Sequence, residues 1–251
     1  MVRFAWAVAL GLACSGSVFA AGYGSVEGQY VLDGAVPDVP PLVKAGDATV
    51  KDANACAVVA VPNDAKAFDP ASKGIANVFV YLRRAPSDIY PELKSSPNKE
   101  VVFDQKNCNF IPHGLIVRTD QVVVCKSDDP VAHNLHTNPF ANTSANFIVQ
   151  PNDRTGTPVK MPSPEALPVK VQCDIHPWMT AWWVVLDHPY AAVTDKEGKF
   201  KIENLPEGEH EFRVWHEEAG YLDRKLSVKV KANETTKLEA KKVKLSAFEK
   251  K

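Results

Sequence analysis

The stretch VQCDIHPWMTAWWVV (Val171–Val185) places three metal donors of different kinds within seven residues. They are the thiol of Cys173, the imidazole of His176 and the thioether of Met179. A thiolate, an imidazole and a weakly bound thioether are donors of a blue-copper centre, which also uses a second histidine. The stretch therefore predicts a copper site, provided that its local structure brings the three side chains together.

The residues on either side of this short segment have the pattern of β-strands. Apolar and polar residues alternate from Val169 to Cys173, as in a half-buried strand, which directs the Cys173 side chain inward. Pro177 interrupts the pattern directly after His176, and a second strand begins near Thr180. We therefore expect the three donors to converge in a tight, hairpin-like loop.

The second histidine has two candidates in the segment SDDPVAHNLHTNP (Ser127–Pro139). His133 and His136 are three residues apart, so on a continuing strand they face opposite sides of the sheet. His133 directly follows the turn at Asp129-Pro130, and the neighbouring Asn134 could brace the two ligand loops through its side-chain amide. We therefore choose His133 as the ligand and expect His136 to be a surface or supporting residue.

Residues 101–187 resemble the cupredoxins, most closely those of the amicyanin and plastocyanin type. The resemblance depends on strand-like sequences at Leu115–Val117 and Val122–Ser127, the pair His133-Asn134 and the Cys-x-x-His-x-x-Met spacing, which is similar to that of amicyanin. The long segment Thr137–Pro168 has no clear counterpart and is expected to be a loop. The resemblance implies a Greek-key β-barrel or sandwich that binds one type 1 copper ion. The implied copper ligands are His133, Cys173, His176 and Met179.

The rest of the chain resembles a carboxypeptidase regulatory-like, or transthyretin-like, β-sandwich. This resemblance is carried by strand and turn patterns in Tyr190–Val214, including Thr194-Asp-x-x-Gly198. The expected opening strands of that fold lie far upstream, in Gly24–Gly34 and Gly74–Leu82. We therefore expect an all-β chain in which a cupredoxin domain is inserted into a sandwich. The expected boundaries are 21–96 and 188–245 for the sandwich and 97–187 for the insert. The alternative is a tandem arrangement with an unclassified N-terminal segment, and the contacts of Gln29–Val31 distinguish the two.

The N-terminus and the composition limit the cellular setting. A positive start, an apolar stretch and small residues before Ala21 indicate a signal peptide over residues 1–20, and hence a periplasmic or secreted protein without a membrane span. The 29 basic and 30 acidic residues nearly balance, which argues against a nucleic-acid partner. Of the four cysteines after residue 20, Cys56 and Cys108 are the candidates for one disulfide, and the alternative is that both stay unpaired.

Two classes of function follow from these features. The motifs of common hydrolases, metalloproteases and nucleotide-binding enzymes are missing, so we expect no enzymatic activity. The first class is an electron carrier that exchanges single electrons with a redox partner protein through a transient contact, with His176 near the surface and Pro177 and Trp178 as the docking patch. The resemblance to amicyanin makes methylamine utilization a conceivable pathway. The second class is a non-redox module that holds copper, or binds a protein or carbohydrate through its sandwich.

Overall fold

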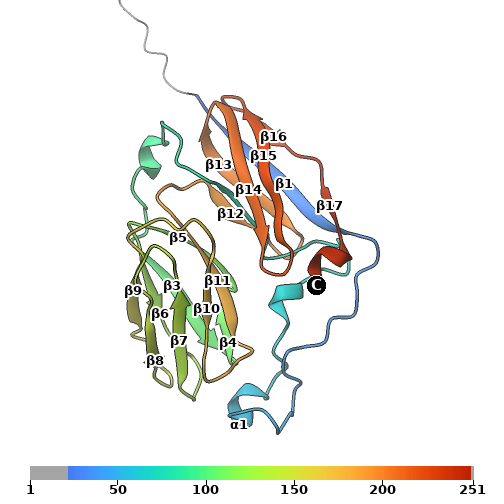
Figure 1. Cartoon of the computed structure of the whole chain (residues 1–251), viewed down its shortest axis with the longest axis vertical. Helices are drawn as coiled ribbons and strands as arrows, with labels where there is room; N and C mark the ends of the chain where they lie inside the picture. Colours follow the sequence, from blue (N-terminus) through green and yellow to red (C-terminus); the bar gives the residue numbers. More distant parts are fainter. Residues whose placement is uncertain (1–21, 250–251) are drawn as a thin grey trace, which may run out of the picture.

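The computed structural model describes residues 22–249, and the expected signal peptide lies outside them. This part of the chain is all-β, which confirms the predicted fold class, and it has two units (Figure 1). Each unit contains two separate sheets that share no strand, so neither forms a closed barrel. Among the described residues, no helix has the length and apolar character needed to cross a membrane.

The outer unit is built from both ends of the chain. One sheet has the order β13-β1-β16, with β17 also paired to β1, and the other has the order β12-β2-β14-β15. Its strands are β1 (Tyr23–Asp33), β2 (Phe79–Leu82), β12 (Ala191–Val193), β13 (Lys199–Pro206), β14 (Gly208–His216), β15 (Gly220–Val230), β16 (Thr235–Lys237) and β17 (Lys241–Lys244). Gln29 pairs with Lys199 in antiparallel register, so the N-terminal strand is part of the same sheet as the late strands.

The middle unit contains the strands between β2 and β12. Its sheets have the orders β5-β11-β10-β7-β8 and β4-β3-β6-β9. Its strands are β3 (Glu100–Lys106), β4 (Asn109–Ile111), β5 (Gly114–Arg118), β6 (Val122–Cys125), β7 (His133–Asn138), β8 (Asn146–Val149), β9 (Thr157–Lys160), β10 (Val169–Gln172) and β11 (Thr180–Leu186). Phe103 and Trp183, from opposite sheets, meet edge to face with ring centroids 5.1 Å apart in its core.

The prediction that Thr137–Pro168 is a loop is wrong, because this segment contains β8 and β9. Both are edge strands, each paired on one side. An edge strand tolerates Pro158, which lacks a ladder N–H, and leaves side chains such as that of Ile148 half exposed. The segment therefore lacks the clean apolar alternation that identifies a strand buried on one face.

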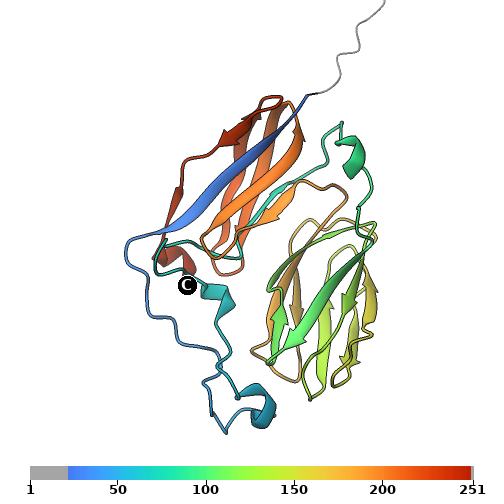
Figure 2. The ribbon, with the colours of Figure 1, turned by 180° about the vertical axis from the view of Figure 1, so that it is seen from behind.

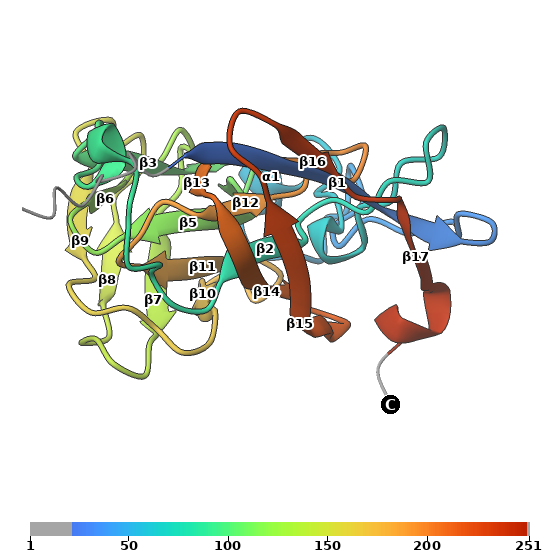
Figure 3. The ribbon, with the colours of Figure 1, turned by 90° about the horizontal axis from the view of Figure 1, so that it is seen from above.

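The two units meet through an apolar cluster and a buried ionic contact. Phe79 and Trp215 of the outer unit pack in one cluster with Val184 of β11. Beside them, the His113 side chain contacts one carboxylate oxygen of Glu217, and the indole N–H of Trp182 donates a hydrogen bond of 2.9 Å to the other. Figure 3 shows the sheets of the two units side by side from above. The middle unit is therefore held by packing as well as by its two chain connections.

The segment between β1 and β2 leaves the outer unit and reaches the far end of the middle unit (Figure 2). It contains helix α1 (Ala53–Cys56) and the 3-10 turn η1 (Asp64–Lys66), while η2 (Pro91–Leu93) and η3 (Leu245–Phe248) lie elsewhere. We call residues 42–61 the cap. The cap is closed at its base by antiparallel pairing of Val43 with Val61 and has a small core formed by Val43, Ala57 and Val61.

The His113–Glu217 contact predicts a characteristic pH dependence of stability. Burial acts to lower the pKa of His113, but its hydrogen bond with Glu217 outweighs this and raises the pKa; burial likewise acts to raise the pKa of Glu217, and the same bond lowers it. The His113 contribution is complete below its ordinary value of 6.5 and is lost as the pH rises through the raised pKa. The Glu217 contribution is complete above 4.5 and is lost as the pH falls through the lowered pKa.

We therefore expect Glu217→Gln to destabilise the protein most between pH 4.5 and 6.5, where both contributions are present. The loss should be about 1.5–3 kcal/mol, the range for hydrogen bonds to charged groups. Chemical denaturation of both proteins across this pH range measures it. The exposed Glu239→Gln is the control. A pH-independent difference between wild type and Glu217→Gln would contradict the ionic character of the contact.

Candidate metal centre

The structure brings three of the predicted donors, those of His133, Cys173 and His176, together and places Met179 at the end of the same loop. Strand β10 ends at Gln172, so Cys173 begins the loop, and β11 begins at Thr180 directly after Met179. Backbone hydrogen bonds from Cys173 N–H to Met179 O (3.1 Å) and from Met179 N–H to His176 O (2.9 Å) close the loop. The local sequence therefore forms the tight turn that the donor spacing required.

His133 enters this site from β7 and meets His176 directly. Their Nδ1 atoms are 3.0 Å apart, and the Cys173 sulfur lies 3.8 Å from the His176 Nδ1. Donors about 2.0–2.3 Å from a common metal ion lie roughly 3–4 Å from one another. Two ring nitrogens at such a separation share either one proton or one metal ion. The geometry of these three donors therefore fits a metal ion, and the sulfur with two imidazoles fits copper.

All four predicted ligands are buried. The side chains of His133, His176 and Met179 are fully inaccessible, and Cys173 is 2% exposed. Met179 packs in the same apolar cluster as Cys173, between the two sheets of the middle unit. His136, the histidine that was not chosen, faces the other side of the sheet, where its Nδ1 lies 3.0 Å from the Asp174 carboxylate.

Two backbone N–H groups stabilise the Cys173 sulfur as a thiolate. Asn134 N–H and His176 N–H donate to it at 3.3 and 3.4 Å. Burial acts to raise the pKa of Cys173, but the hydrogen bonds with the two histidines and the backbone outweigh burial and lower the pKa to about 6. The Asn134 side chain also accepts a hydrogen bond of 2.9 Å from Asp174 N–H, so Asn134 links the two ligand segments as its predicted role requires.

Each histidine is held from its far side by a carboxylate, which the sequence analysis missed. His133 Nε2 lies 2.8 Å from Asp129 Oδ2, and His176 Nε2 lies 3.0 Å from Asp52 Oδ2. A metal-binding imidazole usually donates its second N–H to such a group, which fixes the tautomer and the ring orientation. With Nε2 protonated in this way, both Nδ1 lone pairs would be available to hold a metal ion.

Asp129 is itself fixed inside the protein. Its carboxylate accepts hydrogen bonds from the N–H groups of Asn107 (2.6 Å) and Cys108 (2.9 Å). Burial acts to raise the pKa of Asp129, but its bonds with His133 and these N–H groups lower it. Asp129 lies four residues before His133, and this short spacing could have identified it from the sequence. Asp52 lies 124 residues from His176, and no local pattern identifies such a contact.

The expectation that His176 lies near the surface is wrong, because the cap covers it. The cap is joined to the middle unit by a Cys56–Cys108 disulfide, the pairing expected from the sequence. Closing a loop of 52 residues contributes about 4 kcal/mol by the chain-entropy model. Trp178 packs against the small core of the cap and donates to Cys108 O, whereas Pro177 stays exposed. Pro177 and Trp178 both line a surface hollow together with Leu42, and their role as a docking patch stays a prediction.

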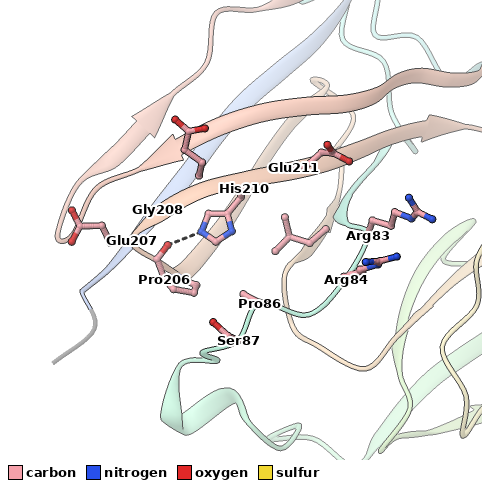
Figure 4. Close-up of a pocket in the computed structure, with 11 residues that line it drawn as sticks. Arg83, Arg84, Pro86, Ser87, Pro206, Glu207, Gly208, His210 and Glu211 are labelled. Atoms are coloured by element: carbon pink, nitrogen blue, oxygen red, sulfur yellow. Dashed lines mark hydrogen bonds between the residues drawn. The ribbon is translucent and has the colours of Figure 1, made fainter. Parts of the chain in front are cut away.

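The outer unit has a surface pocket of its own, of about 520 Å³. Arg83, Arg84 and His210 are among its lining residues, and none of the candidate copper ligands is. Figure 4 shows that both arginine side chains point away from His210, whose Nε2 lies 2.7 Å from the Pro206 carbonyl oxygen. These polar groups do not converge on a common point, so the pocket offers no counterpart to the histidine and cysteine cluster.

Comparison with solved structures returns copper proteins at low similarity. A reduced amicyanin variant matches 36% of this chain and 85% of its own, with 15% identity and a TM-score of 0.31. A purple cupredoxin from Nitrosopumilus maritimus matches 35% of this chain and 99% of its own, with 18% identity and a TM-score of 0.27. A copper-containing nitrite reductase from Thermus scotoductus matches 41% of this chain and 27% of its own, with 17% identity and a TM-score of 0.29. No family model and no curated protein matches the sequence.

The Asp129 contact predicts a loss of copper affinity when its charge is removed. Asp129→Asn weakens the hydrogen bond that orients His133, and changes of this kind cost about 10–100-fold in metal affinity. Competition with a chromophoric chelator measures the effect. Asp128→Asn is the matched control, because this neighbouring carboxylate instead pairs with Lys106 and Arg154 at the surface. Equal affinities of the two variants would contradict the role given to Asp129.

Proposed function

We propose that residues 97–187 form a cupredoxin domain that binds one type 1 copper ion through His133, Cys173, His176 and Met179, and that the protein carries single electrons. The observation that supports this most strongly is the convergence of two imidazole Nδ1 atoms and a hydrogen-bonded cysteine sulfur. Copper supplies a one-electron couple at this position. The low similarity of the matched structures adds no weight, so the proposal rests on this chain's own residues.

The protein's own groups account for the properties that an electron carrier needs. Carboxylates on both histidines and two N–H donors on Cys173 hold the ligands in place, so they move little when the charge of the ion changes. Burial excludes water and competing ligands from the site. Met179 would be the weakly bound fourth ligand, a thioether that would tune the reduction potential more than it would hold the ion.

The proposed setting follows from the same features. The signal-like N-terminus and the disulfide favour the periplasm or the extracellular space, where disulfides persist. The proposed partner is a redox protein that binds transiently, and the proposed role is electron transfer rather than catalysis. The amicyanin-like ligand spacing is the only feature that favours methylamine-type oxidation.

One observation favours a second candidate, a protein that holds copper without exchanging electrons. His176 is fully buried beneath the cap, so a partner cannot touch this ligand while the cap is closed. The rate of electron exchange with small inorganic oxidants distinguishes the two functions. A carrier exchanges electrons rapidly with the cap closed, whereas a holding protein reacts slowly or only after the cap opens.

We expect the disulfide-bonded protein to bind one Cu(II) per chain and to become intensely coloured, because the thiolate of Cys173 is bound directly to the ion. Cys173→Ser removes the thiolate and should abolish the colour while circular dichroism stays unchanged. Visible absorption and metal analysis test this. Cys125→Ala is the control, since Cys125 is a buried core residue that belongs to none of the candidate metal-binding groups and should leave the colour intact. A colourless wild-type protein that takes up no copper would refute the proposal.

Substitutions of Met179 and of His133 should have different effects on copper affinity and on the reduction potential. Met179→Gln should retain copper and lower the reduction potential, because an oxygen donor would replace the weakly bound thioether. His133→Ala should weaken copper binding, because it would remove one of the two imidazole donors, together with the ring that Asp129 holds. Chelator competition and protein voltammetry measure the two properties. Equal losses of affinity in both variants would show that the roles given to Met179 and His133 are wrong.

A further inference from the structure

A second set of soft donors lies directly beside the candidate copper site. The sulfur atoms of Cys56 and Cys108 and a ring nitrogen of His176 all lie within 4.8 Å of one another, and all three residues are buried. Cys108, Asp129 and His133 form another group in which the donor atoms are equally close. The disulfide therefore borders both histidines of the candidate site, from the side of the cap.

The oxidation state of this cysteine pair determines how many thiolates the site contains. A thiolate is the form of cysteine that binds metals, and a disulfide sulfur carries no such charge. With the disulfide closed, Cys173 is the single thiolate among these donors. With the disulfide open, Cys56 and Cys108 supply two more, and soft thiolates favour Cu(I). A blue-copper centre uses one thiolate, so the closed state alone is compatible with it.

We propose that Cys56 and Cys108 in their dithiol form bind Cu(I) together with His176, and that disulfide formation abolishes this second site. The proposal rests on the proposed function in one respect. The copper that Cys56 and Cys108 release is taken up by the blue-copper site, in which His133, Cys173 and Met179 join His176 as ligands. Because His176 belongs to both donor sets, the ion moves between them without leaving the interior. The cap residue Cys56 thus takes part in copper loading before it closes the site.

The closing step is a thiol–disulfide exchange in which copper keeps its oxidation state. The Cys56 and Cys108 thiolates lose two electrons and form their bond, while the S–S bond of an oxidising thiol protein breaks. That partner accepts the two electrons and two protons from solvent and leaves as a dithiol. Cu(I) remains Cu(I) throughout. Such an oxidant is available in compartments where disulfides persist.

Burial of the disulfide supports this order of events. Cys56 is 1% exposed and Cys108 is fully inaccessible, so an ion cannot approach the histidines from the cap side once the bond has formed. The Asp52 contact with His176 and the packing of Trp178 on the cap close the same face. Copper therefore enters the site most easily before the disulfide forms, when only the Asp52 and Trp178 contacts hold the cap in place.

The test uses the full mature chain carrying Cys173→Ser, which removes the thiolate of the proposed blue-copper site. One sample of metal-free protein keeps its disulfide, and the other is reduced with a dithiol reagent and freed of it under anaerobic conditions. Both are titrated with Cu(I) against a chromophoric Cu(I) chelator. The reduced protein should bind one Cu(I) more tightly than the oxidised protein, by more than the roughly 100-fold that an outer-shell partner contributes.

Two variants make the result specific to this cysteine pair. Adding Cys56→Ser and Cys108→Ser to Cys173→Ser should lower the affinity of the reduced protein to that of the oxidised one. Adding Cys125→Ala instead should leave the tight binding intact. Near-ultraviolet thiolate-to-copper absorption should appear only in samples that bind tightly. Equal Cu(I) affinities of the reduced and oxidised Cys173→Ser proteins would overturn the proposal. This outcome leaves the colour of the disulfide-bonded wild type, which tests the proposed function, unaffected.

Discussion

The 3.0 Å approach of the His133 and His176 Nδ1 atoms is the contact on which the rest of the site depends. Two imidazoles keep this arrangement only if their far sides are held, because each ring otherwise rotates to hydrogen bond elsewhere. Asp129 holds one ring from within the middle unit, and Asp52 holds the other from the cap. The site is therefore completed by a residue from a segment that begins and ends in the other unit.

Covering His176 has opposite effects on two properties that the proposed copper carrier needs, protection of the site and access for a redox partner. A closed cap excludes water and competing ligands, and so protects a site with a reactive thiolate. It also separates the ligand from any partner by the thickness of the cap. The hollow lined by Val50, Asp52 and Val131 lies over this region, and the Asp52 carboxylate is about one third exposed there while it contacts the buried ring. The Asp52 side chain thus connects the buried His176 ring directly with the protein surface.

The sequence alone predicted those features of the site that depend on residues close together in the chain. The Cys173, His176 and Met179 donors share one loop, and the choice between His133 and His136 followed from strand alternation, so both required only neighbouring residues. The role of Asp52 could not be predicted, because the contact joins residues 124 positions apart and Asp52 has a left-handed backbone conformation (φ 53°) just before α1. The burial of His176 was missed for the same reason. Strands β8 and β9 were missed because edge strands carry mixed side chains.

The arrangement of the chain explains how a distant segment can reach the site accurately. Strands β1 and β2 anchor both ends of the segment that carries the cap, and each pairs with strands from the C-terminal part of the chain. The middle unit is fixed against this frame by the Phe79, Val184 and Trp215 cluster. A rotation of one unit against the other would separate Asp52 from His176 unless the cap moved with the middle unit. The disulfide provides that coupling, because it ties the cap to Cys108 of the middle unit.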